Sequence, residues 1–135
     1  MKAHYLPLLA SLGCSFATPA LARQYFSAQF CQPAAVAHSE PVTTNCPISA
    51  QWLGGMQHVQ LYYAAPSRTD AVAVSCQLLK FGATGSTEAG QATTSRDQSG
   101  GVLDLYSSRG PANPVGMSVQ CQLAPGAKIL GYYLD

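Results

Sequence analysis

Few residues in this sequence could carry out acid–base or nucleophilic chemistry, and their spacing does not form a catalytic set. Asp70 and Asp104 could supply the two carboxylates of a glycosidase. Asp70, however, opens a predicted strand and is typical of a turn residue. Asp104 stands between Leu103 and Leu105, so alternation along a strand predicts that its carboxylate faces solvent. We therefore do not expect these two carboxylates to form a catalytic pair.

The histidines outside residues 1–22 are His38 and His58, and neither has an acidic residue at ligand spacing. A histidine needs a converging partner before it can act as a general base or a metal ligand. The sequence also contains no G-x-S-x-G nucleophile motif. These patterns predict no catalytic residue, no metal site and no cofactor, and they favour a non-catalytic protein.

The cysteines indicate disulfides rather than zinc. Cys31, Cys46, Cys76 and Cys121 follow the leader, an even number, and no two of them lie within five residues of each other. Zinc sites use much shorter spacings, whereas exported domains commonly pair such cysteines. Three pairings are possible. We favour Cys76 with Cys121, as a bridge between two sheets, because each lies on the apolar face of its own strand. Cys31 then pairs with Cys46.

Tyrosine and glutamine side chains are the candidates for binding. Adjacent tyrosines in a strand point to opposite faces, so one of Tyr62/Tyr63 and one of Tyr132/Tyr133 should face outward, and we take Tyr62 and Tyr132. Exposed aromatics are the usual anchors of binding surfaces. Gln77, Gln120 and Gln122 should share a second outer surface that could bind glycans, although a merely solvated sheet face explains such a row as well.

The elements that must position these residues alternate apolar and polar side chains, bounded by Gly, Pro, Ser and Asn, as strands do. Gly82–Gly101 is predicted to be a long exposed loop that could contain one weak edge strand. Pro125-Gly126 is predicted to form a tight turn that joins the last two strands as a hairpin. The fold class is therefore all-β: a disulfide-stapled antiparallel β-sandwich. The predicted strands are Ala34–His38, Val42–Asn45, Val59–Tyr63, Val72–Leu78, Val102–Ser107, Val115–Leu123 and Lys128–Leu134.

The N-terminal segment has the pattern of a cleavable secretory signal. Lys2 is followed by an apolar stretch and by Ala20-Leu21-Ala22, a small-x-small cleavage site. We expect residues 1–22 to be removed, and residues 23–135 to form one domain that is secreted or periplasmic. A membrane anchor is disfavoured because Pro and Ser interrupt the apolar stretch. Lipidation at Cys14 is disfavoured because Ser11 stands where an aliphatic residue is usual.

The charges of residues 23–135 are balanced, with six basic residues (seven in the chain, less Lys2) and six acidic ones. No run of one sign occurs. Nucleic-acid surfaces and anionic membranes both select clusters of Lys and Arg. The composition therefore argues against a nucleic-acid partner and against electrostatic docking on lipid, and the rest of the chain predicts no membrane span.

The region from Cys46 to Leu134 resembles a loose group of uncharacterised small secreted bacterial β-sandwich proteins. The recurring motifs of that group are Cys-Pro, V-x-C-x-L, a Ser/Gly-rich middle and C-x-L-P-x-G-x-x-I-x-x-Y. They correspond here to Cys46-Pro47, Val74–Leu78, Gly82–Gly101, and Cys121–Gly126 followed by Ile129 and Tyr132. Ala124 stands where the group often has Pro. The resemblance implies a secreted β-sandwich and supplies no activity.

Three functions are compatible with these observations. The first is a secreted module that recognises a carbohydrate or protein surface. The second is a structural or envelope protein that associates with copies of itself, since few lysines guard the predicted edge strands. The third, ranked lowest, is a small inhibitor or hydrolase.

Overall fold

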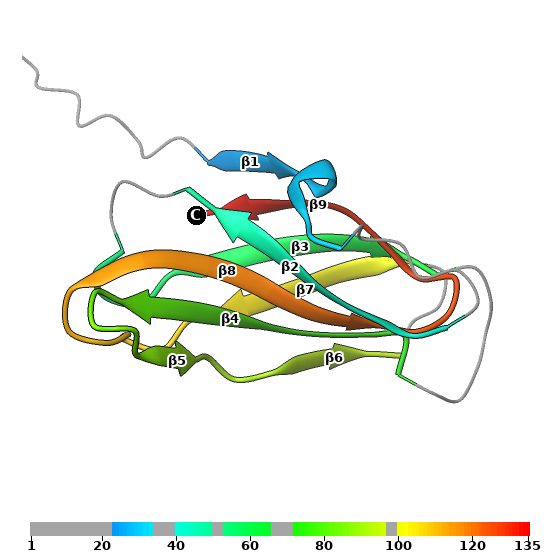
Figure 1. Cartoon of the computed structure of the whole chain (residues 1–135). Coiled ribbons are helices and arrows are strands. Elements are labelled where there is room, and N and C mark those ends of the chain that lie inside the picture. Colours follow the sequence, from blue (N-terminus) through cyan, green and yellow to red (C-terminus); the bar gives the residue numbers. More distant parts are fainter. Residues whose placement is uncertain (1–22, 34–39, 50–52, 66–71, 97–99) are drawn as a thin grey trace, which may run out of the picture.

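The computed structural model describes residues 23–33, 40–49, 53–65, 72–96 and 100–135, and within these ranges it is built almost entirely of strands. Two antiparallel sheets pack face to face, which confirms the predicted β-sandwich (Figure 1). One sheet has the order β1-β9-β3-β7 and the other β2-β8-β4-β5, with β6 also paired to β4. The strands are β1 (Gln24–Ser27), β2 (Val42–Ile48), β3 (His58–Ala64), β4 (Val74–Gly82), β5 (Thr87–Ala89), β6 (Thr93–Ser95), β7 (Gly101–Tyr106), β8 (Pro114–Leu123) and β9 (Lys128–Leu134), and one 3-10 turn, η1 (Ala28–Phe30), follows β1.

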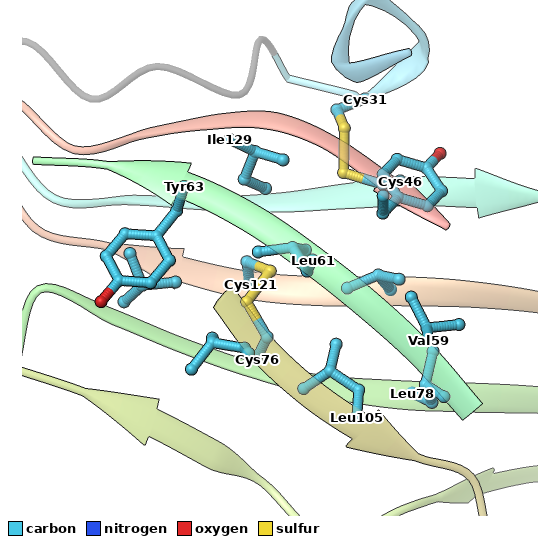
Figure 2. Close-up of a cluster of buried hydrophobic side chains, with 14 of the residues drawn as sticks. Cys31, Cys46, Val59, Leu61, Tyr63, Cys76, Leu78, Leu105, Cys121 and Ile129 are labelled. Atoms are coloured by element: carbon cyan, nitrogen blue, oxygen red, sulfur yellow. A yellow bond between two sulfur atoms is a disulfide. The ribbon is translucent and has the colours of Figure 1, made fainter. Parts of the chain in front are cut away.

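Strict alternation of apolar and polar residues produces the long strands. In β3, Val59, Leu61 and Tyr63 are buried while the residues between them are partly exposed. β4 alternates in the same way from Val74 to Gly82. The buried sets of the two sheets face each other and form one core, in which the Cys76–Cys121 bridge lies among leucines such as Leu78 (Figure 2).

Both predicted disulfides are confirmed, but the position of one differs from expectation. Cys76 of β4 and Cys121 of β8 are directly opposed residues of neighbouring strands, with their Cα atoms 4.1 Å apart. The bridge therefore lies within one sheet and does not join the two sheets. Cys31–Cys46 joins the segment after η1 to β2, and so fixes the polypeptide that crosses from β1 to the other sheet.

The predicted terminal hairpin is wrong. β8 pairs with β2 and β4, whereas β9 pairs with β1 and β3 in the other sheet. Both edges of β8 are already occupied, so the turn through Pro125 and Gly126 carries the chain across the sandwich rather than back along β8. The Ala127 N–H donates to the Ala124 carbonyl within this turn.

Other sequence predictions are corrected in detail. Gly82–Gly101 contains two short edge strands, β5 and β6, rather than one long loop. Val72 precedes β4 and is partly exposed, and Val115 is exposed because the β4–β8 register shifts beside it. β2 extends to Ile48 and is the outermost named strand of its sheet, beside β8, with one isolated bridge between Asn45 and Gln32. An edge position tolerates Pro47. The strand predicted at Ala34–His38 lies outside the described residues.

One end of the core is closed by a lysine. Lys80 occupies an inward position of β4 and is fully buried. Its ammonium donates to the carbonyl oxygens of Gly55 and Arg109, on two loops at the same end of the sandwich. Burial lowers the pKa of Lys80, while the nearby Glu88 carboxylate raises it in part. These bonds fasten both loops to β4, since a buried cation must be hydrogen-bonded to be tolerated.

Removing the Cys76–Cys121 bridge is expected to destabilise the protein more than removing Cys31–Cys46. In the chain-entropy model a separation of 45 residues is worth about 4 kcal/mol and one of 15 residues about 3 kcal/mol. The double variants Cys76→Ala/Cys121→Ala and Cys31→Ala/Cys46→Ala leave no free thiol. Urea unfolding measures both losses, and a larger loss in the Cys31/Cys46 pair would contradict the ranking.

Candidate functional site

The outer surface of the β1-β9-β3-β7 sheet carries a row of aromatic and polar side chains. Tyr25 of β1 opposes Tyr133 of β9, Tyr133 opposes Gln60 of β3, and Gln60 opposes Asp104 of β7. Directly opposed residues of antiparallel strands project to the same face, so one row crosses all four strands. We call this surface the tyrosine face: it comprises Arg23, Tyr25, His58, Gln60, Tyr62, Asp104, Tyr106, Tyr133 and Asp135.

Tyr25, Tyr62 and Tyr133 pack as one cluster. The ring centroids of Tyr25 and Tyr133 are 5.0 Å apart and those of Tyr62 and Tyr133 are 5.6 Å apart, both in tilted or edge-on geometry. The Arg23 guanidinium lies 4.5 Å from the Tyr133 ring centroid, within cation–π distance. Tyr133 is therefore held from three sides.

Tyr25 covers a glycine of the neighbouring strand. A Cβ atom added to Gly131 would meet the Tyr25 ring at 2.7 Å, so the ring rests on bare backbone that no other residue would leave open. Tyr25 is nonetheless 53% exposed. Its ring is therefore supported from below and open to solvent above, which is the arrangement of a stacking platform.

His58 is the centre of the polar part of the tyrosine face. Its Nε2 lies 2.9 Å from Asp104 Oδ1 and its Nδ1 lies 3.2 Å from Asp135 Oδ2. The imidazole ring also stacks on Tyr106, with centroids 4.7 Å apart. Each nitrogen of the ring therefore faces one carboxylate, and the stacking on Tyr106 fixes the plane of the ring.

The remaining charges of the tyrosine face are also paired. Gln60 Nε2 donates to Asp104 Oδ1 at 3.1 Å, and Arg23 Nε lies 2.9 Å from Asp135 Oδ1. Hydrogen bonds from His58 and then from Gln60 lower the pKa of Asp104. Arg23 is thus paired with Asp135 and Asp104 is bonded to His58 and Gln60, and the surface presents carboxylate and amide oxygens beside aromatic rings.

The structure places the two tyrosines that were predicted to bind ligand, Tyr62 and Tyr132, in different environments. Tyr62 lies on the tyrosine face, as expected. Tyr132 is fully buried: its ring stacks on Phe26, its hydroxyl donates to the Pro47 carbonyl at 2.6 Å, and burial raises its pKa to about 12. It is Tyr133 that faces outward, because a β-bulge adds one residue to β9 and reverses the alternation. The choice of Tyr132 as a surface residue is therefore wrong.

The three predicted glutamines do lie together, on the opposite side of the sandwich. Gln77 and Gln120 are directly opposed, and Gln77 Nε2 donates to Gln120 Oε1 at 3.0 Å. Gln122 lies in the next row, opposite Ser75. We call this surface the amide face. The amide groups of this face meet part of their hydrogen-bonding capacity with one another. The residues opposite them in the same cross-strand rows are also polar: Thr43 and Asn45 on β2, Ser75 on β4 and Thr94 on β6.

Sequence reasoning missed Tyr25 and the partners of His58, and it did not select Gln60, Tyr106 or Tyr133 as binding residues. His58 and Asp104 are 46 residues apart in the chain and meet only through the β3–β7 register. Asp104 was expected to face solvent, and it does, with half of its side chain exposed. Nothing in the spacing of His58 could have revealed its partners, because register is set by pairings far apart in sequence.

Comparison with protein-family models finds no match for this chain, and a search of curated proteins finds none either. Among the described residues no group of three or more His, Cys, Asp or Glu side chains could hold a metal ion. Asp104 and Asp135 approach opposite nitrogens of His58 and do not converge on one point. No helix in the described ranges is long and apolar enough to cross a membrane.

The His58–Asp104 pair predicts an acid-dependent loss of stability. Because the pKa of Asp104 is lowered in the folded protein, its stabilisation is present above the unfolded carboxyl value of about 3.9 and is lost as the pH falls through the folded value. The stability difference between wild type and Asp104→Asn, from urea unfolding, should be positive at about pH 5.5 and shrink towards zero at about pH 2. Glu40→Gln, at an exposed position two residues before β2, controls for the loss of one charge. A difference independent of pH would contradict the pairing.

The burial of Tyr132 predicts the reverse behaviour in alkali. Its folded pKa of about 12 lies above the unfolded value of about 10, so its contribution is complete below pH 10 and is lost as the pH rises towards 12. Tyr132→Phe should cost about 1 kcal/mol near neutrality, through the lost bond to Pro47. That cost should diminish above pH 10. Tyr133→Phe, an outward-facing neighbour, should change the free energy of unfolding little, and a larger effect there would reverse our assignment of the two tyrosines.

Proposed function

We propose that this protein is an exported, non-catalytic module that binds neutral carbohydrate through the tyrosine face. The observation that carries the proposal is the exposed Tyr25 platform, which lies in one cross-strand row with Tyr133, Gln60 and Asp104. The C–H face of a sugar ring packs on an exposed aromatic ring, and its hydroxyls bond to amide and carboxylate oxygens, of which the ionised carboxylate is the stronger acceptor.

The geometry of Asp104 supports recognition of hydroxyl groups. Both described hydrogen bonds to this carboxylate, from His58 and Gln60, end on Oδ1. The side chain is half exposed, so Oδ2 is available to accept from a ligand hydroxyl. Gln60 donates through Nε2 to Asp104, which orients its own Oε1 as a second acceptor.

The charge balance supports a neutral ligand. Arg23 is engaged by Asp135, and His58 lies between Asp104 and Asp135. An anionic polysaccharide would gain little from a guanidinium that Asp135 already pairs, and it would meet the exposed carboxylate of Asp104. Both nitrogens of His58 are engaged as well, which leaves no nitrogen to serve as a general base and supports a binding role rather than catalysis.

Export is the second part of the proposal. Two disulfides are characteristic of secreted and periplasmic proteins, and residues 1–22 have the pattern of a secretory signal. Cleavage after Ala22 would make Arg23 the first residue, and Arg23 is already bound to Asp135 and Tyr133. The resemblance to small secreted bacterial β-sandwich proteins agrees with this compartment.

Titration of the mature protein with neutral and anionic oligosaccharides tests the proposal. At least one neutral glycan should bind with a Kd below about 1 mM, and Tyr25→Ala should weaken that binding about tenfold, or about 1.4 kcal/mol. Gln122→Ala on the amide face is the matched control and should bind like wild type. Sedimentation of the same samples shows whether binding depends on self-association.

Three outcomes would overturn the proposal. They are no detectable binding of any neutral glycan at millimolar concentration, binding of anionic glycans alone, and loss of binding in Gln122→Ala but not in Tyr25→Ala. A protein captured from the culture medium by wild type, and lost in Tyr25→Ala, would assign the same face to a protein partner and would contradict carbohydrate recognition.

A further inference from the structure

We infer that the ligand of the tyrosine face is an extended sugar chain that lies obliquely across the four strands, rather than a single sugar or a chain end. This inference rests on the proposed function. The row from Tyr25 to Asp104 spans β1, β9, β3 and β7, which is three inter-strand spacings, or ~14 Å. One sugar ring covers only part of that distance.

The two ends of this path each hold an exposed aromatic ring. Tyr25 lies at the β1 end and Tyr106 at the β7 end, and both are 53% exposed. Tyr106 opposes His58 in the row next to that of Gln60 and Asp104, so the line from Tyr25 to Tyr106 runs diagonally over the sheet. Tyr133 of β9 and the polar side chains of Gln60 and His58 on β3 lie between the two end strands, where the hydroxyls of a chain would pass, and Asp104 lies beside Tyr106 at the β7 end.

Both rings are held in place before a ligand arrives. Tyr25 is supported by the Gly131 backbone and by Tyr133, and Tyr106 is stacked on an imidazole that two carboxylates hold. Rigid anchors lower the entropy cost of binding. Two rigid anchors joined by one ligand act as linked subsites, so the second contact forms at a high effective concentration.

A length series of one neutral glycan tests the inference. With wild-type protein, affinity should rise at least about tenfold from the disaccharide to the tetrasaccharide and change little with further length. In Tyr25→Ala and in Tyr106→Ala the tetrasaccharide should lose most of this gain. The disaccharide should change by about twofold or less in either variant, because it can still occupy the other anchor.

Two controls keep the test independent of folding. Tyr106→Phe retains the ring that stacks on His58 and should keep the length dependence, and Gln122→Ala on the amide face should keep it in full. Thermal unfolding of each variant establishes that it is folded. Equal affinity for the monosaccharide and for longer chains would overturn the extended ligand while leaving carbohydrate binding intact. Silence towards the whole series would instead overturn the proposed function.

Discussion

The β-bulge in β9 decides which side of the sheet each of the last residues faces. Tyr62 opposes Gly131 but Tyr63 opposes Ile129, so Leu130 is an extra residue on β9. An inserted residue reverses the alternation beyond it. Ile129 and Tyr132 therefore both point into the core, and Tyr133 points out.

Both the core and the tyrosine face follow from this reversal. Inside, Tyr132 stacks on Phe26 of β1 and donates to the carbonyl of Pro47 on β2, so one side chain ties three strands of two sheets together. Outside, Gly131 lies under the Tyr25 ring and Tyr133 fills the space between Tyr25 and Tyr62. Without the bulge, a strictly alternating β9 would put the hydroxyl of Tyr132 in solvent and remove the central ring of the cluster.

The two outer surfaces of the sandwich differ in chemistry although both are polar. The tyrosine face combines aromatic rings with paired charges that the neighbouring side chains hold in one orientation. The amide face presents uncharged groups that bond to one another, as Gln77 does to Gln120. Rigid aromatic groups contribute most to specific recognition at surfaces. Amides that are already hydrogen-bonded to one another gain little binding free energy when they exchange those bonds for bonds to a ligand. This contrast is why the tyrosine face carries the functional proposal.

The sequence by itself determined the fold class, the presence of two disulfides and most of the strands, because alternation with period two and an even set of cysteines are local or compositional signals. Only the tertiary structure decided which sheet each strand joins. The predicted β8–β9 hairpin and the inter-sheet Cys76–Cys121 bridge failed for that reason: strand pairing is chosen by hydrogen bonding and packing over the whole chain, not by adjacency in sequence. The meeting of His58 with Asp104, and the burial of Tyr132 rather than Tyr133, likewise depend on the β3–β7 register and on the β9 bulge. A one-residue change of register turns every side chain to the opposite face, and nothing local in the sequence marks where that change occurs.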